Sequence, residues 1–477
     1  MPLPILSPKN NDRASLFSTG DSSRPIKVVI DLSLDIENEV ASYLLALVKR
    51  EGVQELRYLG VLGDEFDGED FSGCGPGVPG VWLRVEDETQ TPDASDGVAF
   101  WGWDSSSPPG SAAVWGNAIR VARSDTRDTT YQHLPFEVAA RQRWLDMAAL
   151  RAASAIGGDI LVTNRPYLLS NSLFHKDRAI PCTPEQALEF IGMYLRVTGR
   201  PTFSCVPDGG TLSAGSRWGF YETAAREAVA VGSVIDPDAA LTDARSKLFL
   251  PYAITRYLTS TLWARDDLHA ALNGSPLRSD GTTAHHHAGT ALMYLLGACD
   301  ATAALVNERL QVGVSDVSTA WQRKDFANAV KKQAPKIWQC FEAAGGAKWV
   351  ALLNLLRNTV HSVPLLPYPD SSSLSSPMVL TGQAKVSELE AAVKDLHSTN
   401  IDHAVWQTPS GDLALLPGPL IDVLVRETAV VLDAVVAGLL KELPLNSTVQ
   451  SPGTDQLQLG RLAVLQLGLQ ARSTVEG

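Results

Sequence analysis

The chain has 477 residues and a formal net charge of −13, from 40 basic and 53 acidic side chains. At about 150 residues per domain, this length predicts two to three domains. A hydrophobic content of 45% is enough to build buried cores. The negative balance argues against tight, non-specific binding to nucleic acid, which relies on a basic surface. It leaves room for an enzyme that meets nucleic acid briefly.

The five cysteines are scattered along the chain and show neither CxxC nor Cys/His zinc spacing, so neither a disulfide framework nor a structural zinc site is expected. The N-terminal sequence lacks the basic start and apolar core of a secretory signal. No uninterrupted apolar run approaches the roughly 20 residues that span a bilayer. We therefore expect a cytoplasmic protein without membrane contacts.

The first ordered elements predict an α/β domain over residues 25–200. Residues 1–24 are rich in Pro, Ser and Asn, and we expect a flexible arm there. The stretch "IKVVID" reads as a buried strand that ends at Asp31, "IENEVASYLLALVKREG" follows with helical spacing, and "ELRYLGVLG" is typical of the next strand. A strand–helix–strand order predicts a parallel sheet.

Residues 64–130 are rich in glycine, proline and serine, and we expect a loop-rich insertion there. Its glycine run "GCGPGVPG" has the spacing of neither a dinucleotide loop nor a phosphate loop. Trp101 and Trp103 in this stretch could stack on nucleic-acid bases, although buried aromatic anchors are the commoner outcome.

Regular elements return after residue 130. "LPFEVAARQRWLDMAALRAASAIGG" predicts a helix that starts at Pro135 and ends at the glycine pair, and "ILVT" predicts a strand entered by Asp159 and followed by Asn164. In "AIPCTPEQALEFIGMYLR", Thr183 and Gln186 have the spacing of a capping box at the start of another helix.

The second half, residues 216–477, predicts an all-α helical bundle domain. Helical periodicity recurs in five segments, with the loop "LPYPDSSSLSSPM" between the fourth and the fifth. The segments are residues 249–272, 289–310, 325–344, 348–363 and 419–443. The run of three histidines at 285–287 is expected at a helix start or in a loop, because consecutive helical side chains point about 100° apart and do not converge on one ion.

Acidic and polar residues bracket the predicted strands of the first half. Asp31 ends a strand, Asp146 interrupts an Ala-rich helix, and Asp159 and Asn164 flank the next strand. Each could be a plain turn, cap or strand-start residue. If they converge at one edge of the sheet, they suit Mg²⁺ or Mn²⁺, which prefer oxygen ligands and can activate water against a phosphodiester.

These motifs resemble PIN-like nuclease domains. The resemblance lies in "VVIDLSLDI", in "LDMAALRAASAIGGDILVTNRPYLL" and in "IPCTPEQALEFI". It covers residues 26–196 and is clear at 26–40 and 142–195. It implies a PIN-like fold with a parallel sheet.

For function, the resemblance implies Mg²⁺- or Mn²⁺-dependent cleavage of RNA. Asp31 and Asp146, with Asp159 or Asn164, would be the metal-binding and catalytic residues. An acid often follows the VT step in the family, and Asn164-Arg165 stands there instead. The family's second acid has two candidates, Glu39 and Glu137.

A polar stripe interrupts the apolar helix "KWVALLNLLRNTVHSVP". Asn354, Arg357, Asn358 and His361 occupy positions i, i+3, i+4 and i+7, which form one face of a helix. Arginine binds phosphate oxygens in a fork, and histidine transfers protons near neutral pH. The plain alternative is a set of hydrogen bonds across a helical bundle.

The stripe resembles the Arg-Asn…His motif of HEPN-like domains, although its Arg-to-His gap is one residue short. The resemblance implies metal-independent RNA cleavage by Arg357, Asn358 and His361, with a homodimer formed through the helical domain.

Three hypotheses follow. The first is an endoribonuclease acting on RNA, including tRNA, in a toxin or phage-defence setting. In the second, only the helical half is active and the first half recognises a partner. The third is a catalytically inactive RNA-sensing or assembly scaffold subunit, which the net charge and the missing acid favour.

Overall fold

The computed structural model describes the chain in segments separated by gaps. The described residues are 3, 16–17, 23–31, 34, 39–48, 50, 52–59, 80–83, 97–104, 107–115, 121–122, 124–155, 157–170, 179–204, 211–229, 245–273, 282–362, 366–367, 378–380, 383–396, 401, 404–408, 410–442 and 454–469. They belong to two compact units. Residues 4–191 and 204–211 make the α/β unit, and residues 1–3, 192–203 and 212–477 make the helical unit.

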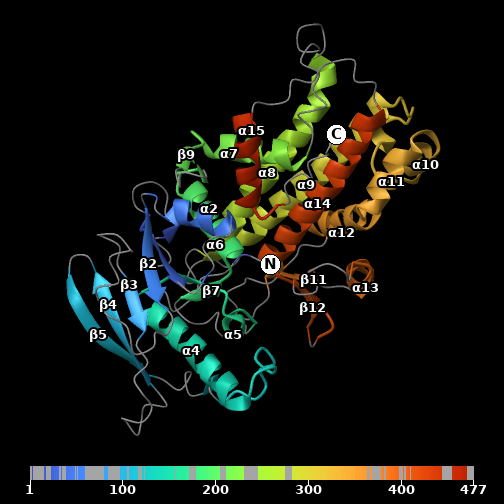
Figure 1. Cartoon of the computed structure of the whole chain (residues 1–477). Helices are drawn as coiled ribbons and strands as arrows, with labels where there is room; N and C mark the ends of the chain where they lie inside the picture. Colours follow the sequence, from blue (N-terminus) through green and yellow to red (C-terminus); the bar gives the residue numbers. More distant parts are fainter. Residues whose placement is uncertain are drawn as a thin grey trace. The chain divides into compact units, whose positions relative to one another are not determined.

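The α/β unit is built around one sheet, and most of its strands and helices are labelled in Figure 1. Its elements are β1 (Ile26–Asp31), α2 (Glu39–Val48), β2 (Val53–Leu59), β3 (Gly80–Leu83), β4 (Gly97–Asp104), β5 (Ser107–Trp115), α4 (Phe136–Ala155), β6 (Ile160–Val162), α5 (Pro166–Ser170), β7 (Ile180–Cys182) and the first part of α6 (Pro184–Val197).

The sheet has the strand order β5-β4-β3-β2-β1-β6-β7. Strands β3, β2, β1, β6 and β7 pair in parallel, with Val29 of β1 opposite Leu56 on one side and Leu161 on the other. The chain builds outward from β1 through β2 and β3 and then crosses back to β6 on the far side of β1. The expectation of an α/β region with a parallel sheet is confirmed. Open α/β sheets bind ligands at the carboxyl ends of the strands next to such a reversal.

The expectation of a loop-rich insertion at 64–130 is wrong for the part that the structure describes. Strand β3 continues the parallel sheet, and β4 and β5 add an antiparallel hairpin beyond it. Glycines and a Pro-Pro pair hid the alternating pattern of these strands, since β5 carries Pro108 and Pro109. Proline is tolerated there because β5 is the last strand of the sheet, where one side needs no ladder hydrogen bonds.

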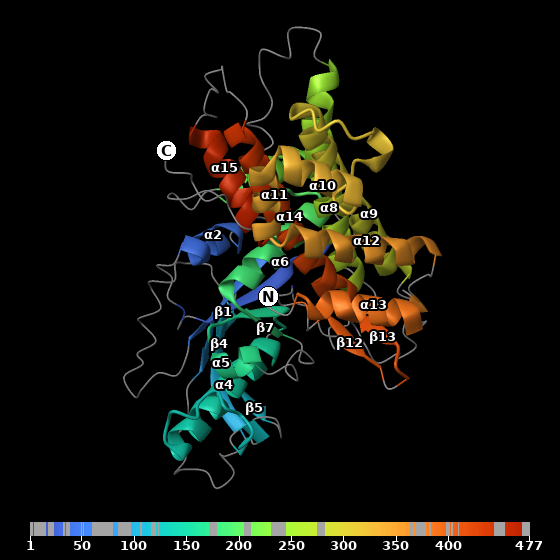
Figure 2. The ribbon, with the colours of Figure 1, turned by 90° about the vertical axis from the view of Figure 1, so that its right-hand side faces the viewer.

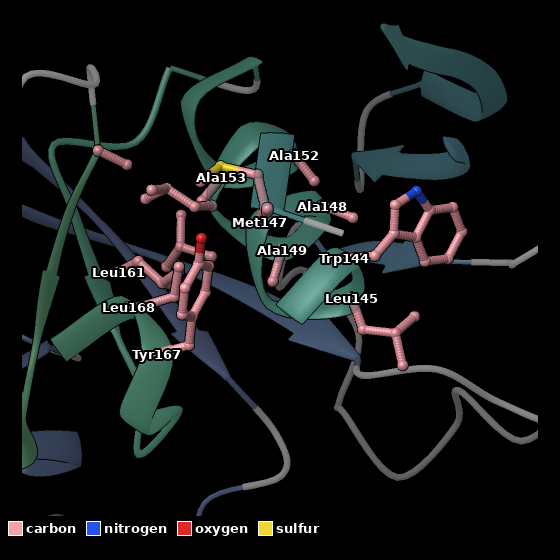
Figure 3. Packing of buried hydrophobic residues seen from close by; sticks show 14 of the residues in the cluster. Trp144, Leu145, Met147, Ala148, Ala149, Ala152, Ala153, Leu161, Tyr167 and Leu168 are labelled. Atoms are coloured by element: carbon pink, nitrogen blue, oxygen red, sulfur yellow. The ribbon is translucent and has the colours of Figure 1, made fainter. Parts of the chain in front are cut away.

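Helix α4 packs its alanine-rich surface into a buried cluster, shown in Figure 3. Ala149, Ala152 and Ala153 are fully buried, and the cluster also takes in Leu161 of β6. Small side chains let the helix lie close to the sheet. The chain then turns at Gly157, whose φ of 81° lies in the left-handed region that glycine tolerates.

The helical unit contains long helices with a small antiparallel sheet. Its helices are α7 (Arg217–Ala228), α8 (Arg245–Asn273), α9 (Thr282–Arg309), the short 3₁₀ turn η7 (Asp316–Ser318), α10 (Lys324–Gln333), α11 (Pro335–Ala343), α12 (Gly346–Ser362), α13 (Gln383–Lys394), α14 (Pro417–Glu442) and α15 (Thr454–Leu465). Helices α8, α9 and α14 lie side by side, as Figure 2 shows from a second direction. The histidines at 285–287 occupy the start of α9, as expected.

The expectation that this half is all-α is therefore wrong. Strands β10 (Leu366–Pro367), β11 (Met378–Leu380), β12 (Val405–Gln407) and β13 (Leu413–Leu415) form an antiparallel sheet in the order β10-β11-β13-β12. Two further short strands, β8 (Thr202–Ser204) and β9 (Thr211–Ser213), pair with each other. Strands this short show no usable periodicity in the sequence, because two or three residues do not establish a period of two.

The predicted boundary near residues 200–215 is also corrected. Residues 192–203 belong to the helical unit. The reason is a buried ion pair: Arg196 at the end of α6 donates from Nε to Asp266 Oδ2 of α8 over 2.6 Å, and both side chains are almost fully buried. An arginine inside an amphipathic helix gives no sign in the sequence of the partner that it will find.

The expectation of a flexible arm at 1–24 is wrong for its described residues. The amide of Leu3 donates to Asp422 Oδ2 over 3.4 Å within the helical unit. Within the α/β unit Leu16 is fully buried, and the ring of Phe17 meets that of Phe190 edge to face, with centroids 6.3 Å apart. Burial of apolar side chains holds these residues against their units.

Among the described helices, α9 is long and apolar enough to cross a membrane by length and composition. Most of the window concerned, 61%, is buried inside the protein. Its neighbours are α8, α12 and α14 of the helical unit. This burial is typical of a core helix.

We predict that Gly158→Ala destabilises the α/β unit by about 1–3 kcal/mol, because an added methyl group overpacks the junction of α4 and the sheet. A Cβ at this position would lie 2.8 Å from Val29 Cγ2 and 2.9 Å from the carbonyl oxygen of Ala153. Urea unfolding of the purified variant measures the change. An unaltered free energy of unfolding would contradict this close approach.

Candidate functional site

The candidate site lies at the carboxyl edge of the parallel sheet, where β1 and β6 run side by side. Ile30 pairs with Val162 in the ladder, so the next residues, Asp31 and Thr163, leave the two strands at the same level. This is the edge where the strand order reverses, and open α/β sheets place ligands there. Asp146 reaches the same place from α4, as its shared contacts below show.

Arg165 joins the two aspartates. Its Nε donates to Asp31 Oδ2 over 2.6 Å, and its Nη1 donates to Asp146 Oδ1 over 3.0 Å. Both carboxylates have no solvent exposure, and Arg165 is 9% exposed. One guanidinium therefore lies between two buried carboxylates, and it is their cationic partner in both ion pairs.

The Asp31 side is fixed by the turn that follows β6. Thr163 Oγ1 donates to Asp31 Oδ2 over 2.8 Å and accepts the backbone N–H of Arg165 over 3.1 Å. The same hydroxyl thus orients the carboxylate and the backbone of the arginine that binds it. Asp31 Oδ2 therefore accepts hydrogen bonds from both Thr163 Oγ1 and Arg165 Nε.

The Asp146 side is fixed by two further donors. The hydroxyl of Tyr131 donates to Asp146 Oδ2 over 2.6 Å, and Gln142 Nε2 donates to Asp146 Oδ1 over 3.0 Å. Gln142 lies one helical turn before Asp146, on the same face of α4. With Arg165, these bonds engage both oxygens of the Asp146 carboxylate.

Burial dominates the protonation of this site. It raises the pKa of Asp146 above the usual range of an aspartate, while the Arg165 guanidinium and the three hydrogen-bond donors oppose the shift. The pKa of Tyr131 is raised as well, by burial first and by the neighbouring Asp146 carboxylate second. Tyr131 is therefore a hydrogen-bond donor and not a source of negative charge.

The residues present do not fit a divalent metal ion. Across the described segments, no group of three or more His, Cys, Asp or Glu side chains could hold one. The two carboxylates that do converge are bound by a cation of the chain itself. Mg²⁺ and Mn²⁺ need several oxygen ligands, and an arginine in the same space repels them.

The expectation that Asp159 joins this site is wrong. Its backbone N–H donates to the carbonyl of Lys27, so it lies at the start of β1 and β6, and Asp31 comes four positions after Lys27 along β1. At about 3.3 Å per residue, this places it roughly 13 Å away, at the opposite edge of the sheet. Arg24 binds both of its carboxylate oxygens, each over 2.8 Å.

The other predicted ligands do not complete a metal site. Asn164 follows Thr163 at the correct edge, but its side chain is exposed. Glu137 is exposed in the first turn of α4, nine residues from Asp146, which is about 13 Å along a helix axis. Glu39 is the first residue of α2, and its side chain lies outside the described part of the chain.

Sequence reasoning missed four residues of this site, namely Arg165, Thr163, Tyr131 and Gln142. The spacing of Gln142 from Asp146 on one helix face was a usable signal. Arg165 was visible only as a departure from the family pattern, because nothing in the sequence says that a side chain after β6 turns back between two carboxylates.

A second candidate site lies on α12 of the helical unit. Asn354, Arg357 and Asn358 are half-buried on this helix, and the backbone of His361 belongs to it, whereas the side chain of His361 lies outside the described part. Arg357 Nη1 donates to Asn358 Oδ1 over 3.4 Å. Within the described structure, the buried Nε of Arg357 has no hydrogen-bond partner.

Asp300 of α9 faces this stripe. The Arg357 guanidinium acts on its carboxyl electrostatically, and within the described segments its buried Oδ1 lacks a hydrogen-bond partner. Burial raises the pKa of Asp300 to about 6, and Arg357, Gln322 and Arg323 oppose the shift. The alternative interpretation of the stripe was a set of hydrogen bonds across the helical bundle. Arg357 Nε and Asp300 Oδ1 do not take part in such a set, because neither has a hydrogen-bond partner within the described structure.

No protein-family model, curated protein or solved structure matches the chain. The resemblances to PIN-like and HEPN-like domains therefore rest on the motifs quoted above. Two arginine-centred arrangements remain for a functional interpretation, one at the edge of the parallel sheet and one on α12.

We predict that Arg165→Met lowers the free energy of unfolding of the α/β unit by about 3–5 kcal/mol, because it leaves two buried carboxylates without their cation. The loss should shrink as the pH falls towards 4, since a protonated Asp146 needs no counter-charge. Urea unfolding, followed by hydrogen exchange of the α4 amides, measures it.

The control is Arg226→Met, which breaks an exposed pair with Glu222 on α7. This variant should change the free energy of unfolding by less than about 0.5 kcal/mol. Equal effects of the two variants would contradict the importance of the Arg165 bridge.

We predict that Asp300→Asn stabilises the helical unit at pH 7. An acid with a raised folded-state pKa holds its proton more firmly in the folded state, so the wild type loses stability as the pH rises from about 4 to about 6. The asparagine variant lacks this loss. The expected gain is about 1–2 kcal/mol after allowance for solvent screening.

Urea unfolding at pH 3.5 and pH 7 tests this prediction, because the two proteins should be equally stable at the lower pH. A variant less stable than the wild type at pH 7 would show that the attraction between Asp300 and Arg357 outweighs burial.

Proposed function

We propose that this chain is an endoribonuclease whose catalytic residues lie in the helical unit and whose PIN-like α/β unit does not supply a metal-dependent site. One observation carries the proposal: the two candidate arginines are engaged differently. Arg165 bridges two buried carboxylates, whereas the Nε of Arg357 has no hydrogen-bond partner within the described structure. A guanidinium that is not fully engaged can still bind phosphate.

In this proposal Arg357 binds the oxygens of the scissile phosphate as a fork. His361 accepts the proton of the ribose 2′-hydroxyl while that oxygen attacks the adjacent phosphorus. A 2′,3′-cyclic phosphate forms as the bond from phosphorus to the 5′-oxygen breaks, and the departing oxygen takes a proton from water. Asn358, which accepts from Arg357, helps to orient the guanidinium. No metal ion is required.

The HEPN-like resemblance also favours a homodimer in which two copies place their stripes against one RNA. RNA, including tRNA, is the proposed substrate. The pairing of PIN-like with HEPN-like features favours a toxin or phage-defence setting in the cytoplasm. A net charge of −13 fits brief contact with RNA better than tight, non-specific binding.

The test is cleavage of end-labelled total RNA and tRNA by the purified protein, with EDTA or with Mn²⁺. Cleavage should survive EDTA and should fall by about 10²-fold or more in Arg357→Ala and His361→Ala, because each removes a group that acts in the transition state. The matched controls are Arg256→Ala and His286→Ala, which remove an exposed arginine and an exposed histidine from the same unit and should leave the rate unchanged.

The opposite pattern would move the chemistry to the α/β unit. Cleavage that EDTA abolishes, that Mn²⁺ restores and that Asp146→Asn removes would overturn the proposal in favour of a metal-dependent site at Asp31 and Asp146.

The second candidate function is that of a non-catalytic RNA-sensing or assembly subunit. The Arg165 bridge favours this alternative. Arg165 binds both Asp31 and Asp146 and so occupies the position that a metal ion would take between them. A folded protein that cleaves no RNA under any condition, yet binds RNA or a protein partner, would establish this alternative.

A further inference from the structure

The surroundings of Asp31 and Asp146 suit a planar, singly charged donor. Tyr131, Gln142 and Thr163 all direct hydrogens at these carboxylates and occupy lone pairs that a metal ion would need. A guanidinium carries several N–H donors in one plane and can add two bonds to two separate oxygens, as Arg165 does.

The net charge and the burial of the Asp31–Asp146 site also favour a guanidinium over a divalent metal ion. Two carboxylates and one guanidinium carry at most one net negative charge, and none of the carboxylate surface is exposed. Arginine is more weakly hydrated than a metal ion or an ammonium group, so its transfer to a site without water costs less free energy. Mg²⁺ gives up its water reluctantly and keeps several waters when bound, which this enclosed pair does not favour.

We propose that the Asp31–Asp146 pair is a guanidinium-binding site which the chain fills with its own Arg165. When Arg165 is removed, the ligand class that fits this site is a small guanidinium compound, and the α/β unit is stable without a divalent cation. Arg165 brings together the end of β1, helix α4 and the turn after β6 from inside the protein. The inference concerns the α/β unit alone and does not depend on the ribonuclease proposal.

The experiment is chemical rescue of Arg165→Ala in the full-length protein. The variant should have a lower Tm than the wild type, because the two carboxylates have lost their cation. Ethylguanidinium chloride at low millimolar concentration should restore about half or more of the lost Tm by binding the folded state only. The same concentrations should leave the wild-type Tm unchanged, because its site is filled, and MnCl₂ or NaCl at equal ionic strength should not rescue the variant.

Two control variants separate site binding from a general salt effect. Arg143→Ala removes a buried arginine of α4, whose Nε donates to the carbonyl of Ala122 and whose Nη1 lies 3.6 Å from Asp128 Oδ2. Ethylguanidinium should rescue it much less. The double variant Arg165→Ala/Asp146→Asn retains one carboxylate, and its response to ethylguanidinium should be largely lost.

Three results would overturn the proposal. The first is an Arg165→Ala protein as stable as the wild type, and the second is rescue by Mn²⁺ that equals or exceeds rescue by ethylguanidinium.

If the variant fails to fold, the test is Mn²⁺ binding to the wild type, measured by electron paramagnetic resonance. The wild type and Asp146→Asn should then bind equally little Mn²⁺, and stoichiometric binding that Asp146→Asn abolishes is the third overturning result.

Discussion

The α/β unit depends on one electrostatic constraint, the placement of a guanidinium between two carboxylates that water does not reach. Asp31 comes from β1 and Asp146 from α4, so the bridge by Arg165 ties the central strand to the helix that covers it. A buried carboxylate without a partner is costly, whereas one that is paired and hydrogen-bonded is tolerated. The sheet edge that would suit a ligand is therefore neutralised from within, and this is why the site argues against metal-dependent chemistry.

Buried arginine–aspartate pairs also occur in the helical unit. Asp266 and Asp422 are almost fully buried, which by itself raises the pKa of each, but the neighbouring arginines Arg196 and Arg265 outweigh burial and hold each pKa below its usual range. Stability from such groups is present at neutral pH and is lost only as the pH falls below the usual range of an aspartate. Asp300 behaves in the opposite way, with its pKa raised. We favour the stripe on α12 as the place for a reaction, because Arg357 Nε and Asp300 Oδ1 lack hydrogen-bond partners within the described structure.

Local signals were enough for several elements. The pattern of β1, the alanine-rich helix α4 and the capping box all have short-range causes; in the box, the amide of Gln186 donates to Thr183 Oγ1 and that of Thr183 to Gln186 Oε1. Strands β3, β4 and β5 were missed because glycine and proline interrupt their alternation. Asp159 was misplaced for a geometric reason: it precedes its strand, and in a parallel sheet the residues before and after a strand lie at opposite edges.

The sequence by itself determined that β1, β2 and β6 are strands and that α4 is a helix, and it marked Asp31 and Asp146 as residues that lie at unusual places in those segments. Period and capping are properties of neighbouring residues, so they can be seen without the fold. Only the tertiary structure decided what the two aspartates do. Their partner, Arg165, lies 134 residues from Asp31 along the chain, and a contact over that separation depends on the strand order and on the direction of a turn, which no local pattern encodes.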